Sequence, residues 1–262
     1  MNKNTVIISI LSIILIIFNI LLVGCLDKNE LPTNGIVIEG KGNYTSIKNA
    51  IDNASKGDTI FVYDGYYYET ILINKSIKLI GAGNNKTVLI YNKNISANII
   101  HVNANNCIIE GFKIIYDINQ SENTETVRGI RVTSSKNKIL NNTILNLKYG
   151  IEMYNCQENI ISYNIFANNT YGIQAYKLYY NDISNNNFSN NTRYGVYLGY
   201  ESQHNIVTSN IFFGNDEAVL ISKNSASLNE ISRNTLINNK QDINECCGAE
   251  GLNTIINNIY KN

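Results

Sequence analysis

Acidic and basic side chains that share one surface are the first candidates for chemistry in this chain. Hydrolysis of a glycosidic bond needs two positioned carboxyl groups. Glu152 lies in a stretch of alternating apolar and variable residues, and Arg131 has the matching place in the preceding stretch. The other acids of this region fall at or near expected turns: Asp182, Glu201, Asp216 and Glu217. Arg131 and Glu152 are therefore the candidate catalytic residues, with an ordinary cross-strand ion pair as the alternative interpretation.

Tyrosines are numerous in the same region. A tyrosine ring offers a flat apolar face and a hydroxyl at its edge, so a file of rings can hold sugars by their faces and bond their hydroxyls. We expect six of them to form a ligand-binding surface: Tyr149, Tyr154, Tyr171, Tyr176, Tyr194 and Tyr197. Because 18 of the 262 residues are tyrosine, a stack that only stabilises neighbouring parts of the chain is the alternative.

The cysteines predict neither a metal site nor a disulfide framework. Cys107, Cys156 and the adjacent pair Cys246 and Cys247 are scattered along the chain without CxxC spacing. The adjacent pair either forms a strained bridge or stays reduced. No metal and no cofactor are therefore expected.

The elements that position these side chains follow from a repeat. An Asn, a branched apolar residue two positions later and another Asn three positions beyond it recur six times. The first Asn of each copy is Asn137, Asn159, Asn181, Asn205, Asn229 and Asn253, at intervals of 22, 22, 24, 24 and 24 residues. Such periods are typical of solenoids, whose repeats bury their apolar faces by stacking on neighbours.

A second phrase precedes the first in each repeat and indicates strands. It reads Gly-Ile-x-Val or a close variant, at residues 129–132, 150–153, 172–175, 195–198 and 218–221. Apolar and variable residues alternate in it, which is the period of a strand with one buried face. Because Ile, Val and Asn replace the Leu of leucine-rich repeats, the sequence predicts an all-β fold, a single-stranded right-handed parallel β-helix. The variable positions, Arg131, Glu152 and the tyrosines among them, would face outward.

The repeated asparagines are predicted to be structural. Asn tolerates the left-handed backbone conformation, and its amide both donates and accepts hydrogen bonds. Equivalent asparagines one turn apart can therefore bond to one another along the stack. Since residues repeated in every turn maintain a scaffold while sites are local additions, we expect these asparagines to form the corners of the solenoid.

The two phrases resemble the repeats of pectin-lyase-like parallel β-helix proteins, including NosD-type periplasmic proteins. The segment from Ile47 to Ile90, with Gly57-Asp58-Thr59-Ile60 and Ser76-Ile77-Lys78-Leu79-Ile80-Gly81, is similar to the opening coils and short N-terminal capping helix of that superfamily. The resemblance covers about residues 36 to 260. It implies the fold but leaves the function open, because the superfamily holds lyases, hydrolases, epimerases and adhesins.

Signatures of the superfamily's enzymes are absent from the sequence. It has no Asp-Asp, Gly-His-Gly or Arg-Ile-Lys of the polygalacturonase kind and no Asp-Pro-His-Asp of the mannuronan epimerase kind. Copper delivery, which the NosD resemblance implies, needs soft or imidazole donors. Beside the cysteines the chain has His101, His204, Met1 and Met153, which fall in separate parts of the sequence. The resemblance is therefore expected to concern the repeats alone.

The N-terminus predicts export. Residues 1–24 have the pattern of a signal peptide, with an apolar run from Val6 to Val23. The run ends in the lipobox Leu22-Val23-Gly24-Cys25, where Cys25 would carry the lipid that holds the protein at the membrane. An uncleaved signal anchor is the alternative, because the run is long enough to cross a bilayer. Residues 25–35 would be a polar tether and residues 36–262 the β-helix domain.

The charge balance limits the classes of partner that we expect for this protein. A formal net charge of zero and a pI near 6.7 provide no basic surface for nucleic acid. The sequence thus predicts a membrane-anchored protein of the extracytoplasmic face that binds a polysaccharide or cell-surface glycan, or is a structural envelope component. The alternative is a carbohydrate-active enzyme, a polysaccharide lyase or glycoside hydrolase of the pectin-lyase superfamily.

Overall fold

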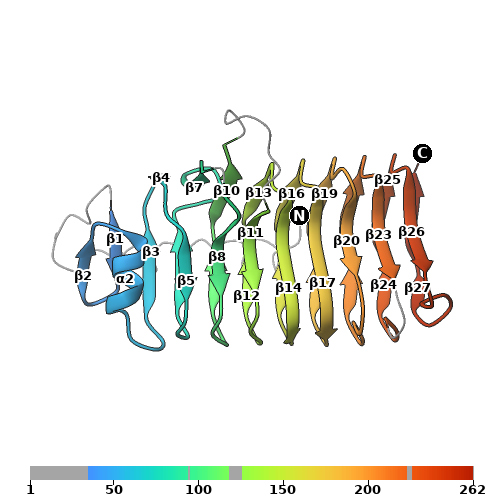
Figure 1. Cartoon of the computed structure of the whole chain (residues 1–262), viewed down its shortest axis with the longest axis horizontal. Helices are drawn as coiled ribbons and strands as arrows, with labels where there is room; N and C mark the ends of the chain where they lie inside the picture. The colour runs from blue at the N-terminus through green and yellow to red at the C-terminus, as the bar shows by residue number, and fades with distance from the viewer. Residues whose placement is uncertain (1–34, 94, 118–125, 223–225, 262) are drawn as a thin grey trace, which may run out of the picture. The chain divides into compact units, whose positions relative to one another are not determined.

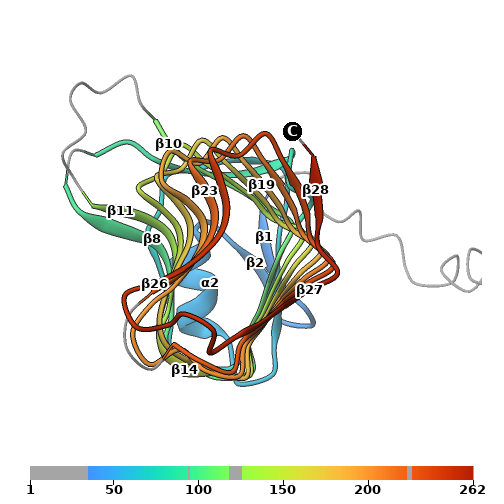
Figure 2. The same cartoon turned by 90° about the vertical axis from the view of Figure 1, so that its right-hand side faces the viewer.

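The computed structural model describes residues 35–93, 95–117, 126–222 and 226–261, which form a parallel β-solenoid. Its coils follow one another along one axis, from the blue N-terminal to the red C-terminal coils in Figure 1. Seen along this axis, successive coils superpose around a common interior (Figure 2). The predicted all-β parallel β-helix is confirmed, with about eight turns. The predicted signal peptide, Cys25 and the tether up to residue 34 lie outside the described residues.

Three sheets, named A, B and C, run along the solenoid. Sheet A contains β2 (Gly42–Tyr44), β1 (Ile36–Ile38), β3 (Thr59–Val62), β6 (Lys78–Gly81), β9 (Ile108–Glu110), β12 (Lys138–Leu140), β15 (Ile160–Ser162), β18 (Asp182–Ser184), β21 (Ile206–Thr208), β24 (Glu230–Ser232) and β27 (Thr254–Ile256). Sheet B contains β4 (Gly65–Tyr67), β7 (Thr87–Tyr91), β10 (Phe112–Tyr116), β13 (Thr143–Leu145), β16 (Ile165–Ala167), β19 (Asn187–Ser189), β22 (Ile211–Phe213), β25 (Thr235–Ile237) and β28 (Ile259–Lys261).

Sheet C carries the candidate site. It contains β5 (Ile71–Ile73), β8 (Ala97–Val102), β11 (Val127–Val132), β14 (Tyr149–Gln157), β17 (Tyr171–Tyr179), β20 (Tyr194–Leu198), β23 (Glu217–Ser222) and β26 (Gln241–Cys246). Neighbouring strands of sheet C are parallel and come from consecutive coils. In sheet A, β1 pairs antiparallel with β2 and β3 before the parallel coils begin.

A short helix, α2 (Ile47–Asn53), covers the N-terminal end of the core, as predicted. It buries Ile47, Ala50 and Ile51 against the first strands. The Ser46 side chain accepts the N–H of Asn49 at 3.1 Å, and the Glu69 carboxylate accepts the N–H groups of Ile47 and Lys48 at 3.0 Å each. The free N–H groups of the first turn are thus satisfied. In the described part of the chain, no helix is long and apolar enough to cross a membrane.

The core consists of rows of equivalent apolar residues. The two predicted rows are confirmed by the strand register, one in sheet A through Ile139, Ile161 and Ile183, and one in sheet C through Ile130, Ile151 and Ile173. A third row, in sheet B, was not predicted: Ile144, Phe166, Phe188, Phe212 and Leu236. Consecutive phenylalanine rings stack at 4.8 Å with interplanar angles of 6° and 8°, which adds aromatic stacking to burial.

Buried asparagines form ladders at the corners. The side-chain oxygen of Asn186 accepts both the backbone N–H and the side-chain N–H of Asn164, at 2.9 and 3.0 Å. The side-chain nitrogen of Asn186 donates to the carbonyl of Ile161 at 2.8 Å. The same bonds recur along two predicted ladders and a third at the end of sheet B: Asn169, Asn191, Asn215 and Asn239.

One part of the asparagine prediction is wrong. The left-handed backbone does not belong to the ladder asparagines but, from Asn137 to Asn239, to the residue before each of them, for example Tyr163 (φ 60°) and Ser209 (φ 58°). The preceding residues include Lys136, Glu158, His204 and Leu228, so the position accepts several residue types. The first of two successive residues therefore makes the left-handed turn, and the second makes the ladder hydrogen bond. Only the second residue requires an amide side chain.

We predict that Asn186→Ala lowers the free energy of unfolding by about 1–3 kcal/mol, because it leaves the buried backbone N–H of Asn164 without a partner. Urea unfolding followed by circular dichroism measures this change. The control is Asn187→Ala, since Asn187 is exposed and such substitutions change stability by less than about 0.5 kcal/mol. Equal effects of the two substitutions would contradict the role given to the ladder.

Candidate functional site

The outer face of sheet C brings the predicted site residues into rows. One row runs from Arg131 to Glu152, Gln174, Tyr197 and Leu220. A second contains Tyr149, Tyr171 and Tyr194, and a third contains Tyr154 and Tyr176. The structure thus places Arg131, Glu152 and all six predicted tyrosines on one face.

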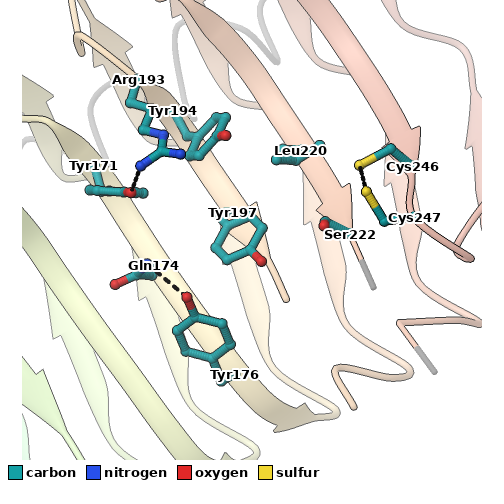
Figure 3. Close-up of a pocket in the computed structure, with 10 residues that line it drawn as sticks. All are labelled: Tyr171, Gln174, Tyr176, Arg193, Tyr194, Tyr197, Leu220, Ser222, Cys246 and Cys247. Carbon is teal, nitrogen blue, oxygen red and sulfur yellow. Dashed lines mark hydrogen bonds between the residues drawn. The ribbon is translucent and has the colours of Figure 1, made fainter. Parts of the chain in front are cut away.

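Four of the six tyrosines line a cavity of about 380 Å³ on this face (Figure 3). The lining residues are Tyr171, Gln174, Tyr176, Arg193, Tyr194, Tyr197, Leu220, Ser222, Cys246 and Cys247. We call this cavity the tyrosine groove. Tyr149 lies outside it and stacks on Tyr171 at 5.0 Å, and Tyr154 lies outside it with 46% of its surface exposed.

The tyrosine rings of the groove meet at different angles. Tyr194 and Tyr197 are nearly parallel at 5.4 Å, whereas Tyr176 meets Tyr197 edge to face at 5.5 Å and 81°. The Tyr176 ring lies against Gly199, where an added Cβ would come within 2.6 Å of ring atoms. Gly199 thus leaves room for the ring that forms one wall of the groove.

Arg193 is the groove residue that sequence reasoning missed. Its guanidinium donates a hydrogen bond to the Tyr171 hydroxyl and lies 5.5 and 5.3 Å from the ring centroids of Tyr171 and Tyr194, within cation–π range. Hydrogen bonding to Tyr194 raises the Arg193 pKa further. Among the described residues, no carboxylate forms an ion pair with it. The sequence signal for Arg193 is its place directly before Tyr194, which precedes the phrase Gly195-Val196.

The groove offers polar groups as well as ring faces. Burial raises the pKa of the Tyr171 and Tyr176 hydroxyls, so both stay protonated at neutral pH and can donate hydrogen bonds. The Gln174 amide donates to the Tyr176 hydroxyl at 2.9 Å and holds it in place. The groove therefore combines apolar faces, hydroxyl donors and one guanidinium, which are the groups that orient a polyhydroxylated ligand.

Arg131 and Glu152 belong to a separate charged cluster at one side of the tyrosines. Glu152 is 3.5 Å from the Nε of Arg131 and only 2.6 Å from the Nε of Arg128, which the sequence analysis had not selected. Arg128 also lies over the Tyr149 ring at 5.4 Å. The Glu152 side chain is 14% exposed. A carboxylate held between two guanidinium groups fits the cross-strand ion pair.

Glu152 and Glu217 do not form a carboxylate pair for glycoside hydrolysis. Glu217 is the register partner of Tyr194, and it lies three strands beyond Glu152 in sheet C. With strands spaced about 4.8 Å apart, the backbones of the two residues are at least about 14 Å apart, and the Glu152 carboxylate is directed to Arg128 and Arg131 of the preceding coil. Glycosidases need carboxyl groups about 5–9.5 Å apart, so these two acids are too distant to act together.

Comparison with known proteins identifies one family. The family model described as "Periplasmic copper-binding protein (NosD)" matches residues 33–247. A comparison with curated proteins finds no match.

Solved structures share the fold. The catalytic domain of a GH87 alpha-1,3-glucanase variant in complex with tetrasaccharides has a TM-score of 0.60 and 17% identity, over 89% of this chain and 46% of that one. A second variant with tetrasaccharides has a TM-score of 0.58 and 17% identity, over 81% and 41%. The domain with nigerose has a TM-score of 0.56 and 18% identity, over 81% and 40%. This chain therefore spans less than half the length of those chains, and the likeness concerns the fold.

The described side chains do not fit a copper site. Copper selects imidazole and soft sulfur donors, yet no group of three or more His, Cys, Asp or Glu residues is placed to hold a metal in the described segments. His204 stacks on Tyr180 at 4.8 Å, and Met153 is buried in the core. His101 contacts Thr133 at 2.9 Å, and burial together with the charge of Arg131 lowers its pKa.

We predict that Glu152→Gln lowers the free energy of unfolding by about 1–2 kcal/mol, because Arg128 and Arg131 lose their partly buried counter-charge. Chemical denaturation measures this loss. The control is Glu158→Gln, since the exposed pair of Glu158 with Lys136 at 3.7 Å contributes less than about 0.5 kcal/mol. A variant with unchanged stability would contradict the structural role of Glu152.

Proposed function

We propose that this chain, which belongs to the family described as periplasmic copper-binding protein (NosD), is an extracytoplasmic protein. We propose further that it binds polysaccharide in the tyrosine groove. The observation that carries the proposal is the convergence of four tyrosine rings and Arg193 on one cavity. Contiguous aromatic surface with a few oriented polar groups marks a ligand site. Scattered rings would instead have fitted a purely structural role.

The form of the groove favours a polymer. It extends over β17, β20, β23 and the end of β26, so a ligand along the solenoid axis meets a new coil about every 4.8 Å. A repeating chain matches a surface that repeats in this way. The saccharides in the glucanase complexes belong to those proteins, and they make α-1,3-gluco-oligosaccharides sensible first probes for this chain.

A binding role without catalysis is the form of the proposal that the charges support. Glu152 is engaged by Arg128 and Arg131, and Glu217 is too far from it for the two to act on one bond. The competing function is a carbohydrate-active enzyme. Shortened or unsaturated oligosaccharides after incubation with the protein would favour that function over ours.

We predict that the protein retains glycans on an oligosaccharide array that includes α-1,3-gluco-oligosaccharides, and that Arg193→Gln and Tyr176→Ala each weaken binding by about tenfold or more. Both substitutions remove groups that line the groove, one a cation and the other a ring face. Isothermal titration with the retained oligosaccharide measures the affinities.

The matched control is Tyr66→Ala, because Tyr66 lies on β4 of sheet B and is 71% exposed. This variant should bind like the unaltered protein, and circular dichroism should show all three variants folded. No retained glycan, or equal affinities for all three folded variants, would refute the groove as the glycan site.

We also propose that Cys25 carries a lipid that anchors the domain at the membrane, on the basis of the sequence Leu22-Val23-Gly24-Cys25. The Cys25→Ala variant should move from the membrane fraction to the soluble fraction, because one residue supplies the attachment for the lipid. Cell fractionation and immunoblotting measure the distribution. Retention of the variant in the membrane would favour an uncleaved signal anchor.

A further inference from the structure

Two adjacent thiols form the C-terminal edge of the tyrosine groove. Cys246 ends β26 and Cys247 follows it, and both line the cavity beside Ser222 and Leu220. Their sulfur atoms lie 2.8 Å apart, and Figure 3 shows the two side chains directed at each other. Cys247 is exposed and Cys246 is partly buried, so an external reagent can reach the pair.

The other described cysteines offer this pair no partner. Cys107 and Cys156 are 0% and 2% exposed within the core, and burial raises the Cys156 pKa to about 12. A buried thiol of this kind is inert because it does not form the nucleophilic thiolate. Among the described cysteines, thiol–disulfide exchange is therefore expected at Cys246 and Cys247.

We infer that Cys246 and Cys247 are a reversible oxidation site, which an external disulfide converts into a disulfide between the two adjacent residues. The exposed Cys247 thiolate attacks one sulfur of the oxidant, whose S–S bond breaks and releases the other half as a thiol, and a mixed disulfide forms. The Cys246 thiolate then attacks the Cys247 sulfur, breaks the mixed disulfide and releases the remaining half of the oxidant as a second thiol. Two thiols lose two protons and two electrons in total, and the oxidant leaves as two thiols. The family's periplasmic description places this chemistry in an oxidising compartment.

The geometry makes such a bond easy to reverse. The Cα atoms of adjacent residues are about 3.8 Å apart, whereas ordinary disulfides join Cα atoms about 4.4–6.8 Å apart. A bond across the shorter separation is strained and therefore more readily reduced. Cys247 has a φ of 61°, and in this left-handed conformation its sulfur already lies 2.8 Å from that of Cys246.

Oxidation would alter the edge of the tyrosine groove, a consequence that rests on the proposed function. It removes two S–H donors beside Ser222, the register partner of Cys246, and fixes the side chain of Cys247. The oxidation site itself does not depend on any ligand, so the two proposals are tested separately.

The test is to equilibrate the full chain in buffers of reduced glutathione and glutathione disulfide, block free thiols with iodoacetamide and digest with trypsin. Both cysteines fall in the peptide of residues 241–261, between Lys240 and Lys261, which holds no other cysteine. We expect this peptide to be unlabelled and lighter by two hydrogen atoms in the oxidising buffers. It should carry two labels after reduction, with half-oxidation at a less reducing ratio than stable structural disulfides show.

Two variants keep the inference open to refutation. Cys107→Ala should leave the oxidation of the peptide unchanged. Cys247→Ser should leave Cys246 labelled or joined to glutathione, with no internal bond. Two labels on the peptide in excess glutathione disulfide, a stable glutathione adduct on the unaltered chain, or a disulfide-linked dimer would each overturn the inference.

Discussion

The hydrogen bond from a backbone N–H at one corner to the side-chain oxygen of the asparagine one coil later is the interaction on which this solenoid depends. Parallel strands satisfy one another, but the corners between them leave buried polar groups with no ladder to join. Asn142, Asn164 and Asn186 supply those partners in sequence, and each also caps a carbonyl from an earlier coil. Because one amide donates and accepts at once, the chain of bonds continues from coil to coil.

This scaffold explains how the groove residues can differ from coil to coil while the path of the coils stays the same. The inward rows and ladders fix the path of every coil, so the outward residues of sheet C are free to differ. Along one row the side chain changes from Arg131 to Glu152, Gln174 and Tyr197 without any change of register. In the coil after Tyr176, Gly199 has no side chain and leaves room for the Tyr176 ring. The groove therefore arises from differences between neighbouring coils on a regular frame.

The charged and aromatic halves of this face differ in how their arginines are engaged. Arg128 and Arg131 use their charge on Glu152, and partly buried charges of this kind must be paired to avoid a desolvation cost. Arg193 instead lies over tyrosine rings, with its charge available to a ligand. The absence of a carboxylate partner for Arg193 among the described residues distinguishes it from the two arginines of the cluster. We therefore place the proposed binding site on the tyrosine side of the face.

The sequence by itself determined the period, the strand alternation, two inward rows and the facing of Arg131, Glu152 and the tyrosines, because these depend on local spacing that every coil repeats. It also contained the third row, since Phe166, Phe188 and Phe212 recur at the same 22- and 24-residue intervals. The tertiary structure alone decided that the left-handed residues precede the ladder asparagines from Asn137 to Asn239. It also decided that Arg128 pairs with Glu152, and that Arg193 and the Cys246–Cys247 pair share a cavity with four of the six tyrosines. Those facts depend on side-chain directions and ring angles between residues of different coils. One-dimensional spacing fixes which residues are neighbours, whereas the contacts made by long side chains are chosen only when the coils pack.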